Sequence, residues 1–287
     1  MKLRLPLNRC IGPGLVALAA GLIGESAERL AEVRTAPVDS VHRARVALKR
    51  ARSTLRLLEK AGAAWAIMPR YRLAELGARM SAARENAVAT ALALTQSRRL
   101  RGREKQVAFL LAAKRGPWAP ADPRPIRQAL LVEARDLAHA PAPPINSGQL
   151  RELLRQSHAR AVRRYLVAVR RPTPESVHEW RKAVIILRDQ LTLAAGRWPR
   201  GAGLAEPLLV RLARQIGRRG DLALLVNRLQ RRRMPSLLLP ARRRLLGRWT
   251  RQSRLATLSV LVAWLQVDAR LTRLLAEEQM SRGRRRS

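Results

Sequence analysis

Apolar residues recur every three or four positions along most of the chain, which is the period of an amphipathic α-helix. Aromatic residues make up only 3% of the chain, while alanine and leucine are abundant, so the composition favours helices over strands. Short interruptions between the stretches predict antiparallel packing, and the predicted class is all-α. The expected helices cover residues 14–34, 40–61, 65–96 with a break near Arg84, 100–114, 126–138, 149–170, 174–195, 204–217, 221–233, 237–266 and 267–280.

Capping residues and prolines mark several of the expected helix ends. Thr173 precedes Pro174, a combination typical of an N-cap followed by proline in the first turn. Asp39 or Ser40 is expected to cap the second helix. Three prolines in residues 140–148 predict a linker there, because proline cannot continue a helix.

A similar phrase occurs twice in the chain. It reads VHRARVALKRAR from residue 41 and VHEWRKAVIILR from residue 177. The shift that aligns His42 with His178 also aligns Glu85 with Asp221, so two separate features keep one offset. This predicts an internal duplication. The predicted units are a first helical repeat at residues 11–139, a linker at 140–148, a second helical repeat at 149–280 and a basic disordered tail at 281–287.

Each copy of the phrase predicts a helix with an apolar arc beside a row of cations. The arcs, expected to be buried, are Val41, Ala44, Leu48, Ala51 and Leu55, and Val177, Trp180, Val184, Leu187 and Leu191. The basic rows are His42, Arg45, Lys49, Arg52 and Arg56, and His178, Arg181, Lys182 and Arg188. Like charges at helical spacing repel, so the recurrence favours a bound polyanion over a solvated face with snorkelling stems. Ile185 aligns with Lys49, which predicts a weaker second row.

The overall charge also indicates an anionic partner. The chain has 58 Lys and Arg residues against 20 Asp and Glu, a formal net charge of +38. Self-repulsion at this charge destabilises a compact protein unless anions bind to it. Arginine predominates over lysine, and its planar guanidinium suits two-pronged contact with phosphate oxygens.

Few residues could support catalysis or hold a metal. Cys10 is the only cysteine, which excludes a disulfide within the chain and a zinc site built from cysteines. The histidines form no HxxxH pair, and there is no phosphate loop of the GxxxxGK[ST] type. We therefore expect no enzymatic activity, no metal and no cofactor, with divalent cations present only as counter-ions of bound phosphates. Glu85 and Asp221 are expected to cap helices or to orient arginines.

The repeated phrases resemble the signature of the CHAD family, the conserved histidine α-helical domain. The segment LARQIGRRGDLALL resembles the family's Gly-x-x-x-Asp-Leu-Ala element, and ARENAV is similar to its Ala-Arg-Asp partner in the first half. The resemblance extends from about Ile11 to about Leu275. It implies two pseudo-symmetric antiparallel helical bundles and a basic central cavity that holds inorganic polyphosphate.

The resemblance also implies a set of polyphosphate-binding residues and a role. The matching positions are His42, Arg45, Lys49, Arg52, Arg56, Arg84, His178, Arg181, Lys182 and Arg188. Ile185, Glu85 and Asp189 depart from the lysine, aspartate and tyrosine of the family pattern. The implied role is non-catalytic recruitment to polyphosphate granules in the cytoplasm.

Two other classes of function remain open. The net charge fits a nucleic-acid-binding protein equally well, although aromatics are few and no known DNA-reading motif is present. The chain could alternatively regulate a separate phosphohydrolase. No oligomeric state is predicted.

The N-terminal residues imitate a signal peptide, because Lys2, Arg4 and Arg9 precede an apolar run at residues 11–23. The helical pattern continues in phase to Arg34, so we expect an intact first helix and a cytoplasmic protein. No stretch has the roughly 18 uninterrupted apolar residues that a membrane span requires.

Overall fold

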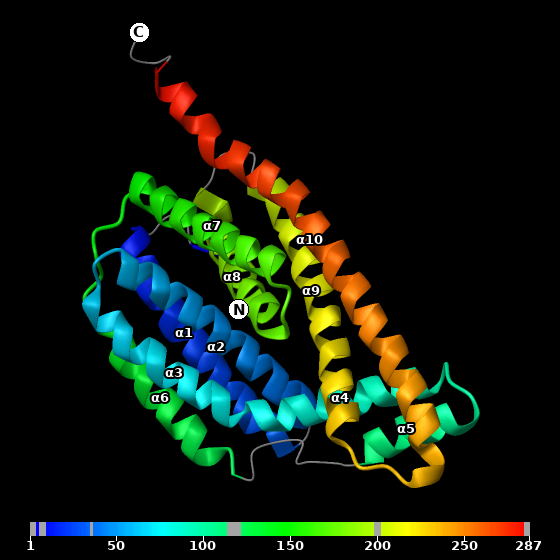
Figure 1. Cartoon of the computed structure of the whole chain (residues 1–287). Helices are drawn as coiled ribbons and strands as arrows, with labels where there is room; N and C mark the ends of the chain where they lie inside the picture. Colours follow the sequence, from blue (N-terminus) through cyan, green and yellow to red (C-terminus); the bar gives the residue numbers. More distant parts are fainter. Residues whose placement is uncertain (1–3, 6–9, 35–36, 114–121, 198–201, 284–287) are drawn as a thin grey trace.

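The computed structural model describes residues 4–5, 10–34, 37–113, 122–197 and 202–283. Within these residues it contains ten α-helices and no strand, which confirms the all-α class (Figure 1). The helices are α1 (Ile11–Ala31), α2 (Pro37–Lys60), α3 (Ile67–Arg79), α4 (Ser81–Ser97), α5 (Gly102–Ala113), α6 (Arg124–Ala138), α7 (Ser147–Arg170), α8 (Pro174–Ala194), α9 (Ala202–Arg231) and α10 (Leu239–Gly283).

Two of the predicted interruptions are wrong. The stretches expected at 204–217 and 221–233 form the single helix α9, and those expected at 237–266 and 267–280 form the single helix α10. In α10 the buried apolar residues stay in helical phase across the expected break. In α9 the buried face changes: Leu209, Leu212 and Ile216 face the large apolar cluster, whereas Leu225 and Leu229 lie on nearly the opposite side of the helix and face the small one. Gly217 and Gly220 of α9 lie inside the helix, and their role there is the close approach of another side chain described below.

Other helix ends differ from the prediction by a few residues. The break expected near Arg84 lies at Met80, between α3 and α4. Helix α2 begins at Pro37, so neither Asp39 nor Ser40 caps it, and Asp39 instead pairs with Arg43 one turn later. The predicted N-cap at Thr173 is confirmed, because its side chain accepts a hydrogen bond of 3.1 Å from the backbone N–H of Ser176.

The buried apolar residues form a large cluster and a smaller one. The large cluster draws on α1, α2, α3 and α6 together with α7, α8, the first part of α9 and the second part of α10. The smaller cluster joins α4 and α5 to the opposite ends of α9 and α10 (Figure 1). Both predicted arcs, from Val41 to Leu55 and from Val177 to Leu191, are buried as expected. Each cluster therefore contains helices from both predicted repeats.

Helices α2 and α8 cross in direct contact. The Ser53 hydroxyl donates to the backbone oxygen of Ile186 at 3.3 Å, and the buried Gln190 amide donates to the backbone oxygen of Ser53 at 3.1 Å. These two hydrogen bonds between the helices fix their register. The crossing brings the two repeated phrases side by side.

The apolar run near the N-terminus is the core helix α1, which packs on α2 and α6. A Cβ on Gly12 would lie 1.9 Å from the backbone oxygen of Pro143, so only glycine permits this contact with the segment between α6 and α7. The Trp65 indole N–H donates to the backbone oxygen of Pro141 at 3.0 Å. The predicted linker is thus held against the first helices.

Helix pairing follows the same order in both halves. Helix α1 packs on α2 as α7 packs on α8, and α2 contacts α3 as α8 contacts α9. A duplication would produce this order, but the order alone does not establish one, and the duplication and the central cavity stay predictions. The predicted tail begins within α10, and its residues after Gly283 lie outside the described part.

Candidate anion-binding site

The residues of the first basic row, on α2, lie in different surroundings. His42 and Lys49 are exposed. Arg45 donates a hydrogen bond to the backbone oxygen of Gly77 on α3. Arg52 and Arg56 are partly buried and belong to a second group of cations at the end of the helix. Arg52 and Arg56, at the end of the predicted row, therefore lie in a partly buried concentration of positive charge.

This concentration, here called the basic cluster, involves three helices that the sequence places far apart. Desolvation lowers the pKa of Arg52, and the positive charge of Arg70 lowers it further. Desolvation also lowers the pKa of Lys60, helped by the charges of Arg160, Arg56 and Arg163. The basic cluster consists of Arg52, Arg56 and Lys60 of α2, Arg70 of α3, and Arg160, Arg163 and Arg164 of α7.

Arg56 has the most strongly lowered pKa in the basic cluster. Burial, followed by the charges of Arg160 and Arg70, lowers its pKa to about 10, and Glu59 offsets part of this effect. Arg160 has a lowered pKa for the same reasons, with burial first and Arg164 next. A guanidinium with a pKa this far below its ordinary value is in a site that disfavours its charge. A bound anion would remove that penalty.

Carboxylates neutralise only part of the basic cluster. Glu59 holds Arg70 through two hydrogen bonds, from Nε at 2.7 Å and from Nη2 at 3.4 Å. The Lys60 ammonium donates to the amide oxygen of Gln156, which carries no charge. The carboxylates therefore orient Arg70 but leave the other arginines with a surplus of positive charge.

The sequence prediction missed the cations contributed by α3 and α7. Lys60 could have been found, because it continues the row one helical turn beyond Arg56. Arg160, Arg163 and Arg164 also share one helical face, and that spacing was a usable signal. No sequence signal pointed to Arg70, because its position depends on how α3 packs against α2.

The second basic row, on α8, is largely neutralised. Lys182 pairs with Glu179, and that pairing lowers the pKa of the carboxyl. Arg188 donates from Nε to the carboxylate of Asp189 at 3.0 Å. Ile185 is partly buried and packs against the large apolar cluster. It faces the core rather than an anion.

Asp189 is itself buried, with 3% of its surface exposed. Burial raises its pKa, and Arg188, Arg50 and Lys49 oppose the rise. A carboxylate in this position uses Arg188 as its structural partner, because an uncompensated buried charge is costly. The departure at residue 189 thus gives Arg188 a structural partner, and its part in anion binding stays a prediction.

Arg181 lies against the glycines of α9. Its Nη2 is 3.3 Å from where a Cβ on Gly217 would lie, and its Nη1 is 3.3 Å from that of Gly220. A side chain at either glycine would crowd the guanidinium. The Gly-Arg-Arg-Gly-Asp segment therefore makes room for an arginine from α8.

A cavity of about 330 Å³ opens beside Arg181, between α8 and α9. His178, Glu175 and Glu179 line its α8 side, and Arg219 lines its α9 side. Arg219 is 7% exposed and donates from Nε to the Thr257 hydroxyl at 2.8 Å. The two glutamates make this cavity a mixed environment rather than a purely basic one.

The two basic rows approach each other at one point. Burial lowers the pKa of His178, as do the charges of Lys182, Arg181 and, from the facing helix, Lys49. The structure thus brings Lys49 of α2 near His178 of α8. Glu179 of α8 interacts electrostatically with His178 and also with Arg160 and Arg164 of the basic cluster, so this carboxylate connects the start of the second row to the cluster.

Both predicted acidic residues lie inside helices rather than at an N-cap position. Asp221 is partly buried in the middle of α9, and Glu85 lies within α4 after the N-cap residue Met80. The side chains of Arg84 and Glu85 lie outside the described residues, so their predicted roles are untested. In the described part of the chain, no three His, Cys, Asp or Glu side chains gather where they could hold a metal ion.

One described helix, Ser236–Ala276, is long and apolar enough to cross a membrane by length and composition alone. About a third of its most apolar stretch is buried in the protein. It carries the buried Trp249 and Trp264, so it serves as a core helix on one face.

Comparison with protein families adds to this geometry. The CHAD domain model matches residues 17–209, which include α2, α7 and α8 and therefore both repeated phrases. The comparison with curated proteins finds no match. The matched region covers well over half of the chain, and with it the whole basic cluster. The chain belongs to the CHAD family, a family associated with polyphosphate binding.

Proposed function

We propose that the protein binds linear inorganic polyphosphate at the basic cluster, without cleaving it. The lowered pKa of Arg56 carries the proposal: folding holds this arginine among the like charges of Arg160, Arg70 and Arg52, which Glu59 offsets only in part. Such an arrangement costs stability in the ligand-free protein. A polyanion would convert the same charges into favourable contacts.

The chemistry of the cluster suits a phosphate chain. Arginines form two-pronged hydrogen bonds to phosphate oxygens, and Lys60 supplies a point charge. Arg52, Arg56 and Lys60 follow one another along α2 at four-residue spacing, which is about 6 Å along the helix axis. Polyphosphate carries a charge on every phosphate and no bases, so a row of cations is enough to bind it.

The proposed role is recruitment to cytoplasmic polyphosphate granules rather than catalysis, with no cofactor and with divalent ions only as counter-ions of the phosphates. Full-length protein incubated with long-chain polyphosphate and Mg²⁺ should release no orthophosphate. Release that Arg56→Gln abolishes would mean that the basic cluster belongs to an enzyme.

Competition binding tests the ligand. Labelled long-chain polyphosphate, RNA and duplex DNA are compared at equal phosphate concentration and 150 mM salt. Polyphosphate should displace both nucleic acids, because the cluster offers arginines and a lysine for phosphates, and the exposed Tyr71 ring beside it already stacks on Arg70, whose guanidinium carbon is 4.5 Å from the ring centre. Displacement of polyphosphate by duplex DNA would favour the nucleic-acid alternative. All three bind less at higher salt, so only their ranking discriminates.

A further inference from the structure

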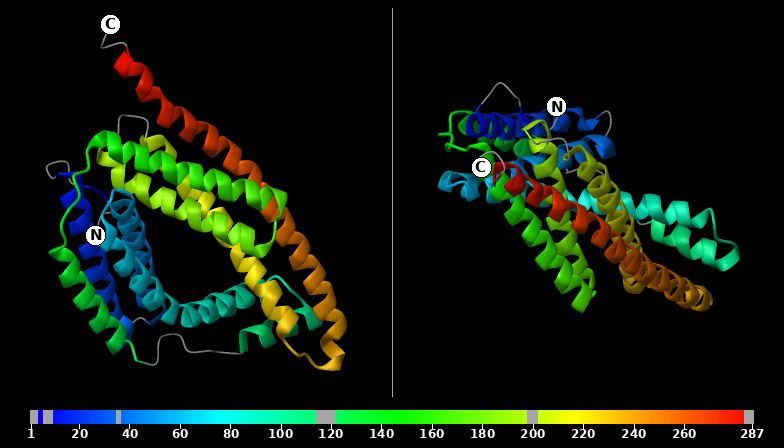
Figure 2. Two further views of the ribbon diagram at one scale, coloured as in Figure 1. Left: turned by 60° about the vertical axis from the view of Figure 1, so that its left-hand side comes forward. Right: turned by 90° about the horizontal axis from the view of Figure 1, so that it is seen from above.

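An apolar stripe runs along the outward face of α10. Leu255, Leu258, Val262 and Leu265 are 60%, 59%, 63% and 54% exposed, although each is a large apolar side chain. They are spaced by three, four and three residues, so they form one straight line on the helix. Helix α10 runs along one edge of the molecule in the left view of Figure 2. These residues are here called the α10 stripe.

The α10 stripe lies in an uncharged stretch of the helix that has arginines at both ends. From Leu255 to Val267 the sequence contains no charged residue. Exposed arginines flank this stretch, with Arg251 and Arg254 before it and Arg270 and Arg273 after it. In the described part of the chain no carboxylate pairs with Arg251, Arg254 or Arg270. Asp268 is close in sequence, but it is bound to His158 of α7 at 2.7 Å.

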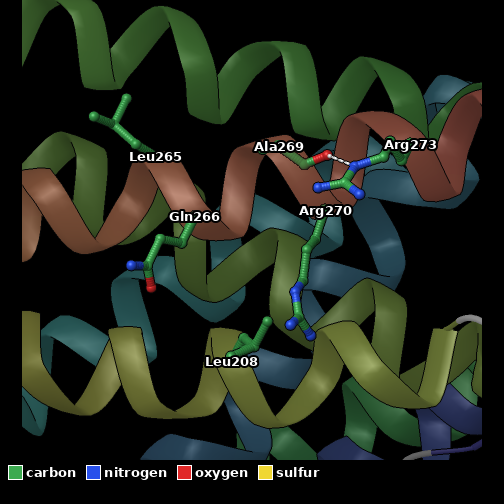
Figure 3. A pocket seen from close by; sticks show the side chains of 6 residues that line it. All are labelled: Leu208, Leu265, Gln266, Ala269, Arg270 and Arg273. Carbon is green, nitrogen blue, oxygen red and sulfur yellow. Dashed lines mark hydrogen bonds between the residues drawn. The ribbon is translucent and has the colours of Figure 1, made fainter.

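Shallow grooves extend the stripe at both ends. One of about 460 Å³ is lined by Leu246, Gly247 and Thr250 with their neighbouring arginines. The other, of about 620 Å³, lies between α9 and α10. Figure 3 shows Gln266 and Arg270 pointing from α10 towards α9, from which Leu208 points into the same space. Each groove thus offers apolar contact beside positive charge.

We propose that the α10 stripe binds an amphipathic helix of a partner protein, one with an apolar stripe flanked by acidic residues. Apolar side chains at three- and four-residue spacing would pack on the leucines and the valine. Carboxylates near both ends of that helix would meet the arginine pairs, which lie about 24 Å apart along α10 between residues 254 and 270. A helix of about 20 residues covers this length.

The charges disfavour a second copy of the chain as the occupant. In an antiparallel pair centred on the stripe, Arg254 of one copy would lie within about one helical turn of Arg270 of the other. In a parallel pair each arginine would face itself. Like charges opposed across an interface reduce its stability. An acidic helix instead turns the same arginines into complementary contacts.

The shape of the exposed face disfavours a lipid surface. Helices that lie in the membrane interface present a broad apolar face, often with tryptophan at the headgroup level. Here the exposed apolar line is one residue wide, and Trp249 and Trp264 point into the core. The uncharged stretch is also only about 20 Å long, shorter than the ~30 Å of hydrocarbon that a spanning helix crosses.

The stripe is separate from the proposed polyphosphate site. It lies beyond residue 209, where the family match ends, and none of its residues belongs to the basic cluster. The two functions can therefore fail independently. A protein that binds polyphosphate through α2 and α7 would present α10 for attachment to another chain.

The test uses full-length protein and three labelled synthetic helices of about 20 residues. The first has leucines at alternating three- and four-residue spacing with glutamates beside them. The second replaces the leucines by serine, and the third replaces the glutamates by lysine. Anisotropy at 150 mM salt should show binding of the first helix at least tenfold tighter than of the other two. Equal binding of the two acidic helices would overturn the proposal, because net charge alone would then explain it.

Matched variants assign the binding to the stripe. Leu258→Gln with Val262→Gln should weaken binding of the first helix at least tenfold, whereas Leu237→Gln should not change it, although Leu237 is also 63% exposed. Arg254→Gln with Arg270→Gln should weaken it at least fivefold, and Arg98→Gln with Arg99→Gln should not. Polyphosphate binding and thermal melting should be unchanged in the stripe variant, because its side chains contact solvent.

Two further outcomes would overturn the proposal. One is a dimer in sedimentation equilibrium that Leu258→Gln with Val262→Gln dissociates, since the stripe would then be a self-association surface. The other is binding to vesicles of phosphatidylcholine and phosphatidylglycerol that the same variant abolishes, since the occupant would then be a membrane. Loss of polyphosphate binding in Arg56→Gln with Arg160→Gln, with the helix still bound, would confirm that the two sites are distinct.

Discussion

Helices α2 and α8 carry the two copies of one phrase, yet they present their cations differently. On α2, Arg52 and Arg56 lie beside further cations from α3 and α7, and their pKa values are lowered. On α8, Lys182 and Arg188 lie beside carboxylates of their own helix. The same signature therefore supplies surplus charge in one copy and internal ion pairs in the other.

The difference shows how neighbours decide what a basic residue does. Glu179 and Asp189 have no acidic counterparts at the aligned positions of α2, which hold Arg43 and Ser53. An ion pair with an adjacent carboxylate satisfies a cation and reduces its attraction for a distant anion. The cations of α2 are instead reinforced by like charges, and this arrangement favours binding an added anion.

The largest expected effect tests this asymmetry. Arg56→Gln with Arg160→Gln should weaken polyphosphate binding by roughly 3 kcal/mol or more, because each lost hydrogen bond between charged groups is worth about 1.5–3 kcal/mol. Calorimetric titration at 150 mM salt measures the loss. The control is Arg98→Gln with Arg99→Gln, which removes as much charge from exposed positions. Equal losses in both variants would show that net charge, and not the cluster, governs affinity.

Ile185→Lys restores the lysine that the second copy lacks. Because Ile185 packs against the large apolar cluster, the substitution should reduce the free energy of unfolding by about 1–2 kcal/mol, as an ammonium is moved towards the core. It should not improve binding. Chemical denaturation and calorimetric titration separate the two quantities. Normal stability with tighter binding would mean that α8 lines the polyphosphate site after all.

Arg56→Gln should stabilise the ligand-free protein while it weakens binding. The pKa of Arg56 is lowered to about 10, so the folded state disfavours the charge that this residue carries at neutral pH. Solvent screening at a half-buried position limits the gain to about 1 kcal/mol. Added salt should stabilise the wild type more than the variant. Thermal melts at 20 mM and 500 mM NaCl measure this, and a destabilised variant would assign Arg56 a structural role instead.

The helices and their buried faces were predictable because they depend on local sequence. Both apolar arcs are buried, and the Thr173 cap forms as the sequence indicated. The continuity of α9 was not predictable from local signals, since Gly217 and Gly220 favour a break until an arginine from another helix is placed beside them. Tertiary packing overrode the local preference there.

The site was predictable only in part. Arg52 and Arg56 were expected from the spacing of the phrase, and Arg160 could have been expected from its own helix. The contribution of Arg70 depends on the packing of α3, which no spacing in the sequence encodes. The neutralisation of Arg188 by a residue directly beside it was visible in the sequence, but the burial of Asp189 that makes the pairing structural was not.

The smallest expected effect concerns His178, where the two rows meet. Burial and the charges of Lys182, Arg181 and Lys49 lower its pKa below the ordinary 6.5, so the folded protein binds fewer protons there than the unfolded chain. Its contribution to stability is therefore complete above pH 6.5 and is lost as the pH falls through the lower folded pKa.

If polyphosphate reaches Lys49 and His178, it will favour the charged imidazole and raise this pKa. Affinity would then increase as the pH falls, by at most a few tenths of a kcal/mol per pH unit, because solvent screens a ring that is only partly desolvated. An NMR titration of the ring protons, assigned with His178→Gln, measures the shift with and without polyphosphate. An unchanged pKa would confine the ligand to the basic cluster of α2, α3 and α7, and would sharpen the contrast between the two copies.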